Sequence, residues 1–163
     1  MAILSKKIVQ EITIIGVLIL AVSLGLQVSF GTLTPFYVVA SGSMMPNLQV
    51  NDLLVIQANR AFAEVQTGDV IVYERPSDHD KVIVHRVASI IGDEPKTIRA
   101  KGDANPASIP GTDFPITETE YLGTVFFVIP QAGYVSQILQ PPLNIAVIGG
   151  IIGIILFRKF KRD

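Results

Sequence analysis

Residues 82–91 read Val-Ile-Val-His-Arg-Val-Ala-Ser-Ile-Ile, and this stretch decides the fold of the central part of the chain. β-Branched residues dominate it, which favours a strand over a helix. Successive side chains of a strand alternate between its two faces, so Ile83, His85 and Val87 should share one face. The sequence therefore predicts a long strand that carries a single imidazole on an otherwise apolar face.

Further short strands are predicted on both sides of this one. Runs rich in β-branched and aromatic residues are separated by turn signals, and no stretch between them keeps a helical period for more than two turns. The expected strands are 36–39, 53–57, 70–73, 97–100 and 121–129, with at most one short helix in 59–65 and loops at 75–81 and 102–112. This pattern predicts a mainly β fold, either a small β-sandwich or a partly open barrel.

Two apolar segments flank the predicted β region. The stretch from Ile12 to Phe30 has no charged residue, and about 20 apolar residues suffice to cross a bilayer. We therefore expect a transmembrane helix at 8–31, a β-rich domain at 32–137 and a second transmembrane helix at 138–158. A removable signal peptide is the alternative for the N-terminus, but the apolar run is longer than usual and lacks a good cleavage site.

The distribution of charge predicts the membrane topology. Lys6 and Lys7 precede the first apolar segment, and four basic residues follow the second. Positive flanks are retained in the cytoplasm, so both termini should be cytoplasmic and the β-rich domain should lie outside the cell membrane. That domain is mildly acidic, which argues against nucleic-acid binding. The chain has no cysteine, which excludes disulfides, a thiolate nucleophile and cysteine-based metal sites.

Candidate chemistry begins in the run Ser41-Gly42-Ser43-Met44-Met45-Pro46, shortly after the first apolar segment. A serine hydroxyl becomes a nucleophile only when a base removes its proton. Of the two histidines, His79 lies between two aspartates in a polar loop, which is typical of solvated surface. His85 is either that base or a core histidine bonded to a backbone carbonyl. The spacing of the two histidines disfavours a metal site.

Four motifs follow the first apolar segment in this order: Ser41-Gly42-Ser43-Met44-Met45-Pro46, Gly68-Asp69-Val70, Val84-His85-Arg86-Val87 and Lys101-Gly102-Asp103-Ala104-Asn105. Together they resemble type I signal peptidases of peptidase family S26. The bacterial form has a lysine at the place of His85. With a histidine there, the chain resembles the Ser-His-Asp branch found in archaea and the endoplasmic reticulum. The resemblance implies a membrane-bound serine endopeptidase, a hydrolase that removes N-terminal signal peptides from exported preproteins at small-x-small sites. It makes 32–137 the extracytoplasmic peptidase domain.

The resemblance also implies roles for single residues. Ser43 matches the nucleophile and His85 the general base, while the Ser41 hydroxyl and the Ser43 N–H match the oxyanion hole. The carboxylate that orients His85 is either Asp113 or Asp103. The family's usual position for this carboxylate falls near Ile109 here, and the next acidic residue is Asp113. We favour Asp113, which requires the loop after Gly102 to bulge. No cofactor is expected.

The expected partners are preprotein signal peptides, the lipid bilayer and the translocation machinery. An extended substrate would add as a strand to an exposed edge, in a groove flanked by 36–40 and 82–85. A non-catalytic, membrane-anchored β-domain that acts as a protein-binding or assembly module is the alternative from another functional class. It would explain the apolar segments and the strands equally well, but it gives Ser43 and His85 no reason to converge.

Overall fold

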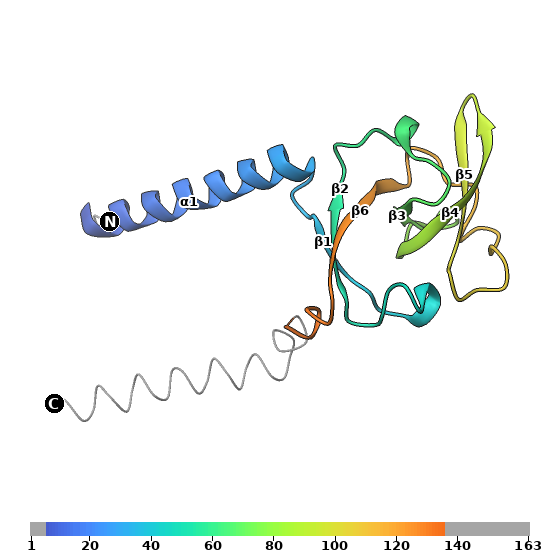
Figure 1. The fold of residues 1–163 in the computed structure, drawn as a ribbon. Coiled ribbons are helices and arrows are strands. Elements are labelled where there is room, and N and C mark those ends of the chain that lie inside the picture. Colours follow the sequence, from blue (N-terminus) through green and yellow to red (C-terminus); the bar gives the residue numbers. More distant parts are fainter. Residues whose placement is uncertain (1–5, 136–163) are drawn as a thin grey trace.

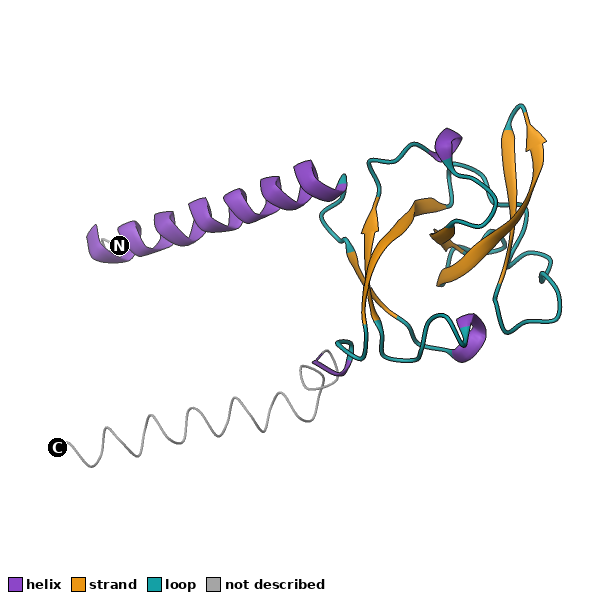
Figure 2. Cartoon of the chain, viewed as in Figure 1, coloured by secondary structure: helices purple, strands orange, loops and turns teal. Residues whose placement is uncertain are grey.

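The structure is a computed structural model that describes residues 6–135. A long helix projects away from a domain built of strands, and the remaining helical elements are single short turns (Figures 1 and 2). In chain order the elements are α1 (Lys6–Phe30), β1 (Phe36–Val38), the 3-10 turn η1 (Gly42–Met44), β2 (Leu53–Gln57), the 3-10 turn η2 (Phe62–Glu64), β3 (Val70–Glu74), β4 (Val82–Asp93), β5 (Lys96–Lys101) and β6 (Tyr121–Ile129).

Helix α1 coincides with the predicted segment 8–31 apart from its ends. Its stretch Val9–Phe30 has 22 residues and is apolar and long enough to cross a membrane. At the helical rise this stretch covers about 33 Å, close to the thickness of the hydrocarbon core. None of the stretch is buried inside the structure, as expected for a surface that faces lipid. The predicted second transmembrane helix at 138–158 lies outside the described residues.

The strands form one six-stranded antiparallel sheet with the order β1-β2-β6-β3-β4-β5. The mainly β fold is therefore confirmed. In the described residues the strands are joined in a single open sheet with β1 and β5 at its edges, so of the two predicted alternatives the β-sandwich is wrong, and the partly open barrel stays a prediction. Shifts of register in β2–β6, β3–β6 and β4–β5 increase the twist of this sheet, which lets one sheet enclose a core on each of its faces.

Each face of the sheet has its own apolar cluster. The larger cluster contains Phe62, Val65, Ile71, Tyr73, Val87, Ile98, Ala100 and Ile116, with Ile83 packed against it. The smaller cluster contains Val39, Met44, Leu48 and Leu54, with Val84 packed against it. Strand β4 therefore contributes alternate residues to both clusters, and the predicted common face of Ile83 and Val87 is confirmed. The smaller cluster anchors η1 to the sheet through Met44.

Most strand limits agree with the sequence predictions within a few residues. Strand β6 has the predicted limits, and the expected loops at 75–81 and 102–112 contain no strand. The only helical turn in 59–65 is η2. Strand β4 continues to Asp93, two residues beyond the prediction, because it forms a hairpin with β5 in which Asp93 is paired with Lys96.

Candidate active site

The serine motif folds into η1, directly after β1. The Ser43 carbonyl accepts a hydrogen bond of 2.8 Å from the Ala104 N–H, which ties η1 to the loop after β5. Gly102 of that loop is buried against the same turn: a Cβ there would lie 2.6 Å from the Ser43 carbonyl oxygen and 2.9 Å from His85 Nε2. The two loops can approach this closely only because residue 102 has no side chain.

His85 lies in the middle of β4, opposite Ile71 of β3, and only 5% of it is exposed. Its Nε2 is 3.0 Å from Ser43 Oγ, and its Nδ1 is 2.6 Å from Asp113 Oδ1. With the proton on Nδ1, the imidazole donates to the carboxylate and leaves Nε2 free to accept the serine proton. The alternative interpretation, a histidine bonded to a backbone carbonyl, is not what the structure contains: both ring nitrogens meet side chains.

Asp113 reaches His85 because its loop turns back on itself. The N–H groups of Thr112 and Asp113 both donate to the Ile109 carbonyl, at 3.1 and 2.7 Å, and this turn produces the bulge that the sequence required. The Ile109 N–H donates to Asp113 Oδ2 at 2.7 Å, and the Tyr73 hydroxyl donates to Oδ1 at 3.1 Å. Burial raises the pKa of Asp113, but the hydrogen bonds from His85, Ile109 and Tyr73 lower the pKa by more, so the carboxylate stays ionised.

Asp103 binds a different partner. Arg86 donates to it in bidentate fashion, with Nε 2.9 Å from Oδ1 and Nη2 2.7 Å from Oδ2. Asn47, which follows η1, donates to Oδ2 at 2.7 Å. The hydrogen bond from Arg86 is the main reason that the pKa of Asp103 is below its ordinary value. Asp103 therefore links β4, η1 and the loop after β5, while Asp113 is the carboxylate that contacts the imidazole.

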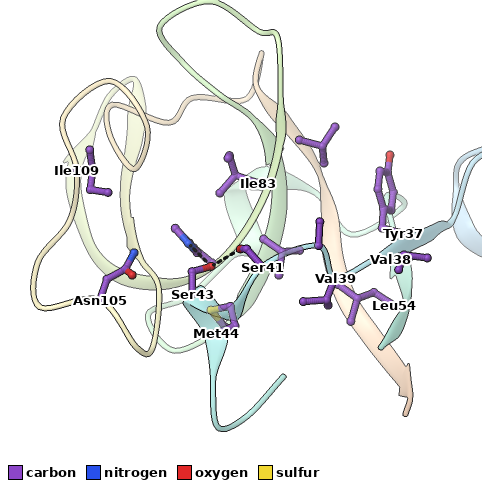
Figure 3. Close-up of a pocket in the computed structure, with 14 residues that line it drawn as sticks. Tyr37, Val38, Val39, Ser41, Ser43, Met44, Leu54, Ile83, Asn105 and Ile109 are labelled. Carbon is purple, nitrogen blue, oxygen red and sulfur yellow. Dashed lines mark hydrogen bonds between the residues drawn. The ribbon is translucent and has the colours of Figure 1, made fainter. Parts of the chain in front are cut away.

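Ser41 lies beside Ser43, with the two hydroxyl oxygens 3.4 Å apart (Figure 3). Its backbone is extended at the start of η1. The Ser41 hydroxyl is thus within a few ångströms of any carbonyl carbon that Ser43 could attack. This is the position that a side-chain donor to an oxyanion needs.

An open pocket of about 320 Å³ leads away from the two serines. Residues 37–40 and 82–85 line this pocket. In Figure 3, Tyr37 to Val39 lie on one side of the two serines, and Asn105 and Ile109 lie on the other side. The two segments expected to flank a substrate groove therefore both line the pocket, except for Phe36. The wall is mostly apolar, which suits small uncharged side chains.

The second histidine takes no part in this arrangement. His79 is 46% exposed, and its Nδ1 is 3.3 Å from Glu74 Oε2 at the turn between β3 and β4. Within residues 6–135, no group of three or more His, Cys, Asp and Glu side chains could hold a metal ion.

Two contributors to the site were not predicted from the sequence. Tyr73, completely buried in β3, contacts Asp113, and Asn47 contacts Asp103. The alternation of β3 places Tyr73 on the same face as Ile71, but only the structure shows that Ile71 is the register partner of His85. No comparable pattern pointed to Asn47.

Comparison with known proteins decides the family. Residues 8–104, more than half of the chain, match the family model described as signal peptidase, peptidase S26. The chain belongs to this signal peptidase family. The matched residues include Ser43, His85 and Asp103 but end before Asp113, so the family model does not cover Asp113.

Curated relatives are catalytic subunits of the signal peptidase complex from fungi. The sec11 subunit of Neurospora crassa is 32% identical over 139 residues, which cover 81% of this chain and 80% of the relative. That of Sclerotinia sclerotiorum is 34% identical with the same coverage, and that of Pyricularia oryzae is 34% identical over 77% of this chain and 76% of the relative. This signal peptidase is thus of the endoplasmic-reticulum type: a membrane-associated protease, and so a hydrolase, that removes signal peptides.

Proposed function

We propose that Ser43, His85 and Asp113 form the catalytic triad with which this signal peptidase cleaves the signal peptide. The observation that supports this most strongly is the unbroken series of contacts from Ser43 Oγ to His85 Nε2 at 3.0 Å and from His85 Nδ1 to Asp113 Oδ1 at 2.6 Å. His85 takes the serine proton as Ser43 attacks the scissile carbonyl. Asp113 holds the imidazole in the required tautomer and stabilises the imidazolium that forms.

The reaction then follows the chemistry of serine proteases. Attack by Ser43 Oγ gives a tetrahedral intermediate, whose oxyanion accepts hydrogen bonds from the Ser41 hydroxyl and the Ser43 N–H. His85 passes its proton to the leaving amine, which departs as the N-terminus of the mature protein. The signal peptide remains on Ser43 as an ester. His85 next deprotonates a water molecule that attacks this ester, which releases the signal peptide and restores the serine.

The pocket supports a preference for small residues before the cleaved bond. It opens beside the two serines between residues 37–40 and 82–85, so an extended preprotein could lie along these segments as an added strand. The small side chains of a small-x-small site would pack against the apolar side chains of Val39, Ile83 and Val84, which line the pocket. Larger side chains would clash with the same three residues and would be excluded.

We further propose that the enzyme is a multi-pass membrane protein with both termini in the cytoplasm. Residues 8–31 and 138–158 would span the membrane, and 32–137 would be the extracytoplasmic peptidase domain. The support is the position of Lys6 and Lys7 before the first segment and of Arg158 to Arg162 after the second. Because the fungal relatives are named as subunits of a complex, we propose partner subunits and contact with the translocation machinery.

The absence of cysteine makes this topology easy to test. Single Glu118→Cys and Asp163→Cys variants should be treated with a membrane-impermeant maleimide in intact cells. Glu118 is exposed in the peptidase domain, so its variant should be labelled from outside, whereas Asp163→Cys should be labelled only after permeabilisation. External labelling of Asp163→Cys would contradict the second span.

The catalytic assignment is tested by His85→Ala with His79→Ala as its matched control. Both variants remove one of the two histidines, but only His85 contacts Ser43. Cleavage of a membrane preprotein should fall by at least about 10³-fold in His85→Ala and stay near wild type in His79→Ala. Normal processing by a folded His85→Ala protein would refute the triad and favour the non-catalytic binding module.

A further inference from the structure

Tyr73 is a buried polar side chain next to the triad. It lies in β3 opposite Ile83 of β4 and Tyr121 of β6, and none of its surface is exposed. Its ring belongs to the larger apolar cluster. Its hydroxyl leaves that cluster and donates to Asp113 Oδ1 at 3.1 Å. The phenol is thus held by the core of the sheet while its polar end faces the carboxylate.

Asp113 is fixed at both of its carboxylate oxygens. Oδ2 accepts from the Ile109 N–H at 2.7 Å, and Oδ1 accepts from both Tyr73 and His85 Nδ1. The phenol oxygen is also 3.5 Å from His85 Nδ1, so the phenol, the carboxylate and the imidazole meet at one point. Without the phenol, His85 would be the only side chain bound to Oδ1 among these contacts, and the carboxylate could rotate with less restraint.

The phenol acts as a permanent donor in this position. Burial raises the pKa of Tyr73 far above its ordinary value, and the charge and hydrogen bond of Asp113 raise it further. The hydroxyl therefore keeps its proton at every pH at which the enzyme could work. A buried donor that never ionises can share the negative charge of a carboxylate without changing the net charge of the site.

We propose that Tyr73 is a positioning residue of the triad, whose hydroxyl holds Asp113 Oδ1 where it meets His85 Nδ1 and draws off part of the carboxylate's negative charge. This inference rests on the proposed triad and adds a fourth member to it. Tyr73 touches no substrate in this arrangement. It acts on catalysis through Asp113 and His85.

The hydroxyl should influence the pH dependence of turnover. When it donates to Asp113, the carboxylate is a weaker partner for a protonated imidazole. Its removal strengthens that partnership, so the acid limb of the pH profile of turnover should move to a higher pH. The titratable groups that face the imidazole are Tyr73 and Asp113. Nearby, Arg86 and Asp103 neutralise each other, and the Lys101 ammonium is bound to the carbonyls of Gly102 and Asn105.

The test is Tyr73→Phe in the full-length membrane enzyme, with Tyr121→Phe as the matched control. Tyr121 is a neighbouring strand tyrosine whose hydroxyl bonds to Thr124 and the Arg60 carbonyl instead of the triad. In Tyr73→Phe, kcat/KM for a preprotein should fall about ten-fold at its optimum, as expected when a hydrogen bond to a charged group is lost. The acid limb of its pH profile should move to higher pH by about half a unit or more, while Tyr121→Phe should keep the wild-type profile.

Two results would overturn the inference: wild-type turnover in Tyr73→Phe, or reduced turnover with an acid limb that stays in place or moves to lower pH. Comparison with Asp113→Asn gives a second criterion, because Tyr73→Phe should cause little further loss in that background. A full additional loss there would also contradict the proposal. If His85→Ala were active, the triad itself would fail, whereas an inactive His85→Ala with a normal Tyr73→Phe would refute only the role of Tyr73.

A second variant covers the case in which Tyr73→Phe does not fold. A ring-fluorinated tyrosine at position 73 keeps the hydroxyl and makes it a stronger donor. The acid limb should then move to lower pH, opposite to the shift expected for Tyr73→Phe. An unchanged limb, or a shift to higher pH, would contradict the proposal.

Discussion

Gly102→Ala is a small change that should disable the site without unfolding the protein. Gly102 is buried where the loop after β5 meets η1. A Cβ at this position would lie 2.6 Å from the Ser43 carbonyl oxygen, 2.7 Å from Asn105 Nδ2 and 2.9 Å from His85 Nε2. The obstacle is space rather than backbone conformation. Asn105 can rotate away, but the Ser43 carbonyl belongs to the backbone that presents the nucleophile.

The contacts give the size of the effect. The Cβ-to-carbonyl distance must increase from 2.6 Å to an ordinary contact of at least 3.4 Å, an opening of at least 0.8 Å. A displacement of about 1 Å in a catalytic group costs about 10²-fold in rate. We therefore expect kcat/KM for preprotein cleavage to fall about 100-fold in Gly102→Ala. The Tm should fall by about 4–12 °C, because overpacking of one methyl group costs about 1–3 kcal/mol and each kcal/mol lowers the Tm of a domain of roughly 100 residues by about 4 °C.

Gly92→Ala is the matched control. Gly92 lies in β4 within the β4–β5 hairpin, and a Cβ there would approach the Pro95 carbonyl oxygen to 3.2 Å and the Thr97 side chain to 3.5 Å. It contacts no residue of the triad, so its turnover should stay near wild type. Wild-type kcat/KM in a folded Gly102→Ala protein would refute the argument that the approach of these two loops sets the position of Ser43.

Three further predictions concern other residues of the site. Ser41→Ala should lower kcat by about 10²–10³-fold with little change in KM, since it removes one donor to the oxyanion; steady-state kinetics check this, and a loss confined to KM would contradict it. Asp113→Asn should lower kcat by about 10³–10⁴-fold, and Asp103→Asn should lower it by far less, since of these two carboxylates Asp113 contacts the imidazole. Equal losses of kcat in the two variants would contradict the assignment of Asp113. Asp103→Asn should instead lower the free energy of unfolding at neutral pH by about 1–3 kcal/mol. Arg86 holds the pKa of Asp103 below its ordinary 3.8, so this stabilisation is complete above that value and is lost as pH falls through the lower pKa of the folded protein. Denaturant titrations of both proteins at several pH values should therefore converge in acid, and a difference that persists there would contradict the ion pair as its source.

The strands of this domain were largely predictable because their signal is local. The β-branched alternation of 82–91 placed His85 on the same face as Val87, and that face is buried in the structure. The number of sheets was not predictable from the same pattern. It depends on β6 pairing between β2 and β3 and on shifts of register within those pairs, which are long-range features that no short stretch of sequence specifies.

The residues of the site also differ in how far the sequence could predict them. The serine and histidine of the site lie in motifs that could be recognised in the sequence, but its carboxylate does not. Asp113 reaches the imidazole through a turn that is closed by hydrogen bonds to the Ile109 carbonyl, and turns of this kind leave little trace in sequence. Asp103 lies in the more conspicuous motif but is bound by Arg86, whose register partner Lys101 ends β5 two residues before Asp103. The sequence identified the region of the acid and favoured Asp113 over Asp103, and in the structure Asp113 is the carboxylate that contacts the imidazole.

Cleavage by Ser43→Ala is the most direct test of the central claim. Purified wild-type and Ser43→Ala enzymes should be incubated in lipid vesicles with a preprotein, and the products should be identified by mass spectrometry. The proposed mechanism predicts that wild type cuts a single bond after a small-x-small site and that Ser43→Ala, folded to the same extent, forms no such product above background. Formation of the same product by Ser43→Ala at a rate near that of wild type would show that another group is the nucleophile.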